Sequence, residues 1–150
     1  MPAYALVLLG HVLFAAIVIG ATVSYALWIA LAERAPEHLA FTIRAVRRSD
    51  RLVAIPAYLL LLVSGLVLAG AGRFPLDRPW LLWGTVLYVV TLVVGFALFG
   101  PTVRRELAAL ERGGPADPEY RRRRRDAWLY TAFTIAMLVA ILALMVAKPF

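Results

Sequence analysis

The stretch that decides the fold is Pro2–Ala32, PAYALVLLGHVLFAAIVIGATVSYALWIALA, which contains no Asp, Glu, Lys or Arg. A helix of about 20 apolar residues crosses the roughly 30 Å of bilayer hydrocarbon. Three further uncharged tracts follow it, at Leu52–Gly72, Pro79–Val103 and Ala127–Ala147. Because hydrocarbon satisfies no backbone N–H or C=O group, each tract is predicted to be a helix. The sequence therefore predicts an all-α integral membrane protein, a bundle of four transmembrane helices in one domain over residues 1–150, with spans at about 4–32, 52–71, 80–103 and 127–147.

The composition supports a membrane protein whose first helix is retained. The chain is 63% hydrophobic, whereas a soluble domain is about 45–50% apolar. A cleavable signal peptide has a basic start and an apolar region of only about 7–15 residues. Here no Lys or Arg precedes the apolar run, which continues without a charge to Ala32.

Basic residues are distributed unequally between the connections, and this distribution predicts the orientation. The two long connections carry most of them: Arg34, Arg44, Arg47, Arg48, Arg51, Arg104, Arg105, Arg112 and the run Arg121, Arg122, Arg123, Arg124 and Arg125. The opposite side has only Arg73, Arg78 and Lys148. Since Lys and Arg are retained in the cytoplasm, we expect an N-out/C-out protein of the bacterial cytoplasmic (inner) membrane.

The same arginines predict a partner. Next to a span, a basic residue attracts anionic lipid by about 1 kcal/mol near the surface. We therefore assign Arg44, Arg47, Arg48 and the five-arginine run to topology and to anionic lipid at the cytoplasmic face, and we expect no nucleic-acid partner.

The first long connection has a helical pattern of its own. Pro36 and Glu37 suit a first turn, and Leu39, Ile43 and Val46 lie on one face of a helical wheel. A short amphipathic cytoplasmic helix is therefore predicted between the first two spans. It either lies on the inner leaflet or extends into the second span.

Two aspartates are predicted to lie at cytoplasmic helix entrances. Asp50 and Asp126 each stand beside arginine just before an apolar tract. A helix dipole and an ion pair explain a carboxylate at such a position. Cation binding or proton relay is the alternative role.

Small residues recur at a spacing that allows helix backbones to approach closely in lipid. They are Ala16, Gly20 and Ser24 in the first tract, and Gly65 and Ala69 in the second. We predict that these faces pack inside the bundle.

Few residues in this sequence are candidates for a catalytic or ligand-binding role. The chain has no Cys and two His, which excludes thiolate ligands and disfavours a multi-histidine metal site. His11 lies within the first span, where a polar residue is a functional hypothesis. It is a candidate haem or metal ligand, with Met137, Met145 or a second His11 from another copy as its partner. The structural alternative is a neutral histidine hydrogen-bonded to a neighbouring helix, for instance to Thr85 or Thr134.

A series of short motifs resembles a known family. In order they are Gly10-His11-Val12-Leu13, Arg48-Ser49-Asp50-Arg51, Pro56 with Ser64-Gly65-Leu66, Pro79-Trp80-Leu81-Leu82, Glu119-Tyr120 and Met145-Val146-Ala147-Lys148-Pro149. Together they resemble the bacterial predicted integral membrane proteins grouped as domain of unknown function 2269. That family is distantly similar to the copper-resistance D family and to a small membrane protoporphyrinogen oxidase family. The resemblance implies that His11 matches a histidine near which the oxidase family binds haem.

Two functional hypotheses follow. The first is a non-enzymatic membrane module that assists or stabilises a membrane complex or a homo-oligomer. It rests on the small-residue faces, the basic connections and spans without charges. The second is a haem- or metal-binding redox protein that uses His11, with haem b as the candidate cofactor. The first is preferred, and an absorption spectrum of the purified protein with His11→Ala as comparison separates the two.

Overall fold

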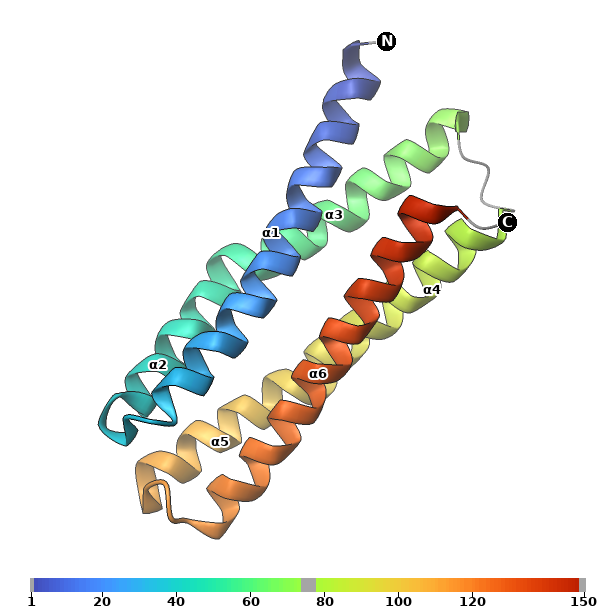
Figure 1. Ribbon diagram of the computed structural model, residues 1–150. Coiled ribbons are helices and arrows are strands. Elements are labelled where there is room, and N and C mark those ends of the chain that lie inside the picture. Colours follow the sequence, from blue (N-terminus) through green and yellow to red (C-terminus); the bar gives the residue numbers. More distant parts are fainter. Residues whose placement is uncertain (1, 74–77, 149–150) are drawn as a thin grey trace.

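The computed structural model describes residues 2–73 and 78–148 and folds them into four long helical runs (Figure 1). The first run is α1 (Pro2–Ala32) and the last is α6 (Pro118–Ala147). The second run joins α2 (Pro36–Ser49), η1 (Asp50–Ala54), α3 (Ile55–Leu68) and η2 (Ala69–Arg73). The third joins α4 (Pro79–Val93), η3 (Val94–Phe99) and α5 (Gly100–Gly113). Each run is long and apolar enough to cross a membrane, which confirms the predicted all-α fold with four spans.

The runs form two antiparallel hairpins. In the N-terminal hairpin α1 packs against α3, and in the C-terminal hairpin α6 packs against both α4 and α5. The turns at 33–35 and 114–117 lie together at one end of the bundle, opposite the two chain termini (Figure 1). We call this end, formed by α2, α5, the start of α6 and the two turns, the basic end. The two long connections that carry most of the arginines therefore lie at the same end.

The amphipathic helix of the first connection is continuous with the second span. Asp50 and Ile55 both keep right-handed helical backbone angles where α2, η1 and α3 meet, because no Gly or Pro interrupts residues 37–55. Of the two alternatives, the extension is the one observed. The buried face of α2 is formed by Leu39 and Ile43.

No α-helix begins at Asp50 or Asp126, so a helix N-terminus does not explain these carboxylates, and their position at the cytoplasmic entrances of the spans stays a prediction. Asp50 lies within the continuous second run, and Asp126 lies inside α6. Charged residues reduce hydropathy, but they do not end a helix as Gly or Pro does. The fourth run begins after Asp117, as the sequence Asp117-Pro118-Glu119 predicts for a capped helix that continues through the arginines. The Asp117 Oδ1 accepts hydrogen bonds from the backbone N–H groups of Glu119 and Tyr120 at 2.6 and 3.3 Å.

Two wide helical turns occur next to prolines. The π-helical segments η1 and η3 end just before Pro56 and Pro101, which occupy the first turns of α3 and α5. Proline has no N–H to donate to the carbonyl four residues earlier, so the regular α-helical hydrogen-bond pattern cannot continue through it. π-Helical turns of this kind occur frequently at functional sites.

Two buried clusters hold the helices together. One lies within the spans and includes Val18, Leu61, Tyr88 and Leu138. The Tyr88 hydroxyl donates to the Tyr58 carbonyl and so links α4 to α3 across the hairpins. The second cluster lies at the basic end and contains Ile29, Ala32, Leu39, Ile43, Leu107, Ala109, Leu110 and Tyr120.

The predicted small-residue faces divide into two cases. A Cβ at Gly65 would lie 3.1 Å from His11 Cε1, so α1 and α3 do approach closely there. Ala69 is buried and Ser24 is half-buried. Ala16 and Gly20 are exposed, and a Cβ at Gly20 would meet nothing within 4 Å. For these two residues the prediction of packing inside the bundle is wrong, because α1 turns this face away from the rest of the chain.

Candidate ligand site between the hairpins

A pocket of about 310 Å³ lies between the two hairpins, and every helical run contributes to its wall. It extends from Glu106 and Arg124 at the basic end to Tyr58 and Thr91 in the spans. Two of the three described π-helical segments line it: η1 contributes Asp50 and Arg51, and η3 contributes Gly95, Phe96 and Phe99. The two places where proline interrupts the α-helical pattern therefore border one cavity.

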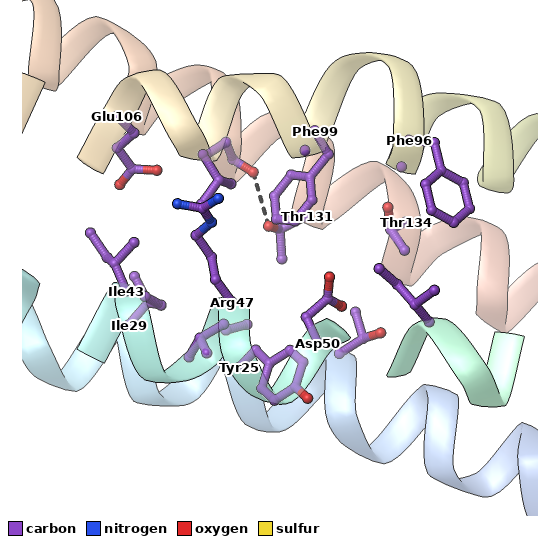
Figure 2. A pocket seen from close by; sticks show the side chains of 18 of the residues that line it. Tyr25, Ile29, Ile43, Arg47, Asp50, Phe96, Phe99, Glu106, Thr131 and Thr134 are labelled. Carbon is purple, nitrogen blue, oxygen red and sulfur yellow. Dashed lines mark hydrogen bonds between the residues drawn. The ribbon is translucent and has the colours of Figure 1, made fainter. Parts of the chain in front are cut away.

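Three arginines line the pocket without an ion pair. Within residues 2–73 and 78–148, Arg47, Arg51 and Arg104 have no carboxylate within 4.0 Å, although several other arginines are paired. The charges of Arg51 and Arg104 repel the partly buried Arg47, and Glu111 offsets part of that repulsion. Figure 2 shows Arg47 reaching from α2 toward the C-terminal hairpin. We call these three arginine side chains, which come from both hairpins and line the cavity, the arginine cluster. Arg47 is half-buried, whereas Arg51 and Arg104 are exposed.

One carboxylate accompanies this cluster. Asp50 points into the space between the hairpins, on the side where Thr131 and Thr134 of α6 lie (Figure 2). Burial disfavours its charge, and the nearby Arg51 favours it, yet no ion pair joins the two within the described residues. Three guanidinium groups against one carboxylate leave this part of the pocket positively charged.

A partly buried ion-pair network borders the pocket at the basic end. Arg124 of α6 donates to Glu33 and to Glu106, the second bond measuring 3.0 Å. Trp128 also donates to Glu33, at 3.0 Å, and the Arg124 guanidinium lies 4.8 Å from the centre of the Trp128 ring. Glu106 is 0% exposed, and its Oε2 has no hydrogen-bond partner among the described residues. Since Glu33 follows α1 directly, the network fastens one hairpin to the other.

Toward the spans the lining is mostly aromatic and aliphatic, although Tyr58 and Thr91 also line it. Ile55, Leu92, Phe96 and Phe99 line this part. The cavity passes beside Gly95, where an added Cβ would meet nothing within 4 Å. One cavity therefore offers a charged end and an apolar end.

The His11 site has a different geometry. His11 Nδ1 lies 2.9 Å from Ser64 Oγ on α3, within hydrogen-bond distance. This is the structural alternative predicted for His11, a hydrogen bond to a neighbouring helix, but the partner is Ser64 and not Thr85 or Thr134. Met145 packs against Gly84 of α4, so these two candidate ligands contact different helices. Met137 is half-buried in α6. Among the described residues no group of three or more His, Cys, Asp or Glu is placed to hold a metal ion, and haem binding at His11 stays a prediction.

The arginines assigned to topology and lipid have several roles in the structure. Arg44 pairs with Glu111 of α5 at 2.6 Å, and Arg123 pairs with Glu119 at 3.9 Å. Arg124, only 14% exposed at its side chain, holds the buried network, so its assignment to a lipid-facing role is wrong. Arg48, Arg121, Arg122 and Arg125 are exposed, and for them lipid attraction stays a prediction.

Sequence reasoning did not find the pocket. Phe96, Arg104 and Glu106 belong to the third run, whereas Thr131 belongs to the fourth, and Tyr25 and Asp50 come from the first two runs. No spacing along the chain connects the residues of different runs. The available signal was the pair Pro56 and Pro101, each inside a helical tract, because proline there predicts a local departure from α-helical geometry.

The fold and this pocket define an integral membrane helical bundle with a mixed polar and apolar cavity between two hairpins. The family model described as "Predicted integral membrane protein (DUF2269)" matches residues 5–149, and the chain belongs to that family. No curated protein and no solved structure matches the chain. The distant similarity to copper-resistance D proteins and to the protoporphyrinogen oxidase family therefore stays a prediction.

Proposed function

We propose that this protein is a non-enzymatic module of the bacterial inner membrane that holds an amphipathic membrane molecule between its two hairpins. The observation that carries the proposal is the cavity of about 310 Å³ with a charged and an apolar end. Sites for small molecules commonly enclose about 300–1,000 Å³. A molecule with a polar head and a hydrocarbon part matches both ends at once.

The contacts between the hairpins support a stabilising role for such a molecule. The hairpins are joined at the basic end by the Arg124 network and by Arg44 with Glu111, and within the spans by Tyr88 with Tyr58. The cavity lies between these two sets of contacts. A molecule that fills it adds contacts to both hairpins, and so stabilises their association by mass action.

Filling the cavity tests the proposal. Gly95→Leu places a side chain where a Cβ meets nothing, in the wall of the pocket. We expect the fraction of protein that retains a co-purified amphipathic molecule to fall roughly tenfold, since about 1.4 kcal/mol of lost affinity has that effect. Native mass spectrometry of the protein in mild detergent measures the bound fraction.

Gly70→Leu is the matched control. A Cβ there also meets nothing within 4 Å, but Gly70 does not line the cavity, so the variant should bind as the wild type does. Wild-type protein that carries no such molecule, or equal losses in the two variants, contradicts the proposed function.

The proposed orientation places the basic end in the cytoplasm, in agreement with the retention of positive charge there. The absence of cysteine allows single-cysteine labelling. Ala3→Cys and Ala116→Cys introduce thiols at exposed positions of opposite ends. We expect a membrane-impermeant maleimide to label Ala3→Cys in cells with permeabilised outer membranes, and Ala116→Cys only after the inner membrane is opened. The reverse pattern would overturn the orientation and leave the fold unaffected.

A further inference from the structure

We infer that the molecule held between the hairpins is an anionic phospholipid whose phosphate is bound by Arg47, Arg51 and Arg104. This inference rests on the proposed function and specifies its ligand. The three side chains line one cavity, come from both hairpins and have no ion pair within the described residues.

The charge balance favours an anion. Arg51 and Arg104 both act on Arg47 as like charges, a repulsive arrangement that an anion between them relieves. The Asp50 carboxylate beside these arginines has no hydrogen bond or ion pair among the described residues. Arginine donates several hydrogen bonds in a plane that matches phosphate oxygens, and such charge-assisted bonds are the strong ones.

The position of the cluster favours a lipid over a soluble phosphate compound. From Arg47 the cavity continues past Phe99 and Phe96 (Figure 2), and Leu92 also lines it. These residues belong to an uncharged tract, so this end of the cavity lies at the depth of hydrocarbon. A phosphate attached to an acyl chain fits both parts, whereas a free phosphate leaves the aromatic part unfilled.

The Asp50 carboxylate distinguishes between lipid headgroups. Asp50 accepts hydrogen bonds, and a headgroup with hydroxyl donors satisfies it without adding a charge. A headgroup with an ammonium group would also pair with Asp50, but it would leave the excess of arginine unneutralised. The structure therefore favours phosphatidylglycerol over phosphatidylethanolamine.

Adjacent arginines provide the decisive comparison. Arg47 lines the cavity, whereas Arg48 is exposed and does not. Both substitutions to alanine remove one positive charge from α2. In phosphatidylcholine nanodiscs titrated with phosphatidylglycerol, we expect Arg47→Ala to weaken binding roughly tenfold. Arg48→Ala should change it by less than about twofold, because Arg48 does not line the cavity and acts on it only through a screened charge.

Two further binding measurements identify the headgroup of the lipid. Asp50→Asn removes the negative charge next to the proposed phosphate but keeps an oxygen that can accept from a headgroup hydroxyl, so it should strengthen phosphatidylglycerol binding. Phosphatidylethanolamine should bind more weakly than phosphatidylglycerol to the wild type, and inorganic phosphate should not compete. The inference is overturned if Arg47→Ala and Arg48→Ala behave alike, if Asp50→Asn weakens binding, or if the two lipids bind equally. If one of these results occurs while Gly95→Leu still loses its ligand, the anionic phospholipid is refuted as the ligand. The proposed function then stands.

Discussion

Replacing Arg124 with alanine should lower the unfolding free energy by about 3–5 kcal/mol, the cost of removing one partner of a buried ion pair. Arg124 is the shared partner of Glu33 and Glu106. Without it the fully buried Glu106 would have no ion-pair partner among the described residues, and the link from α6 to the end of α1 would be lost. Unfolding by a denaturing detergent, followed by the fluorescence of the nearby tryptophan Trp128, measures the change.

Arg122→Ala is the matched control for this prediction. It removes the same charge from the same helix at an exposed position, where substitutions usually change stability by no more than about 0.5 kcal/mol. Arg124→Ala with Glu106→Gln should be less damaging than the sum of the two single changes, because neutral Gln needs no cation. Equal effects of Arg124→Ala and Arg122→Ala would show that the network contributes nothing to the association of the hairpins.

Gly65→Leu should destabilise the N-terminal hairpin by about 1–3 kcal/mol, as overpacking of a close contact does. Even a Cβ at this position would lie 3.1 Å from the His11 ring. A leucine would therefore displace that ring from Ser64, to which it is hydrogen-bonded at 2.9 Å. Thermal unfolding in detergent, followed by circular dichroism, provides the measurement.

Gly70→Leu serves again as control, since the same helical run has open space there. His11→Ala should also rescue part of the loss in the double variant, because it removes the ring that the leucine meets. A Gly65→Leu protein as stable as Gly70→Leu would contradict the close approach of α1 and α3 at this point.

Much of the architecture was predictable because a bilayer imposes strict local requirements. A tract such as Pro2–Ala32 must be helical in hydrocarbon whatever its neighbours are, and the four tracts became four helical runs. Helix starts within the charged segments were predictable where a cap or a proline marks them, as at Pro36 and Asp117. Asp50 and Asp126 instead lie within continuous helical runs, because a helix end depends on caps and breakers more than on charge.

The candidate site was not predictable to the same degree. Arg47 and Asp50 were singled out from the sequence, but for lipid attraction and for a helix entrance. Their common cavity depends on how the second run lies against the third and fourth. Arg124 was one of five adjacent arginines with equal local signals. Only contact with Glu33 and Glu106, far away in sequence, distinguishes it from Arg122.

The sequence by itself determined that this chain is a four-span helical membrane protein, because the length and hydropathy of each tract are properties of that tract alone. Tertiary structure alone decided which small residues pack, which arginine is buried and where a cavity remains. Those features depend on helix rotation and on the two proline-linked π-helical turns, which set the facing surfaces of separate runs. Hydropathy is nearly uniform around a span in lipid, so it does not specify which face of a helix turns inward.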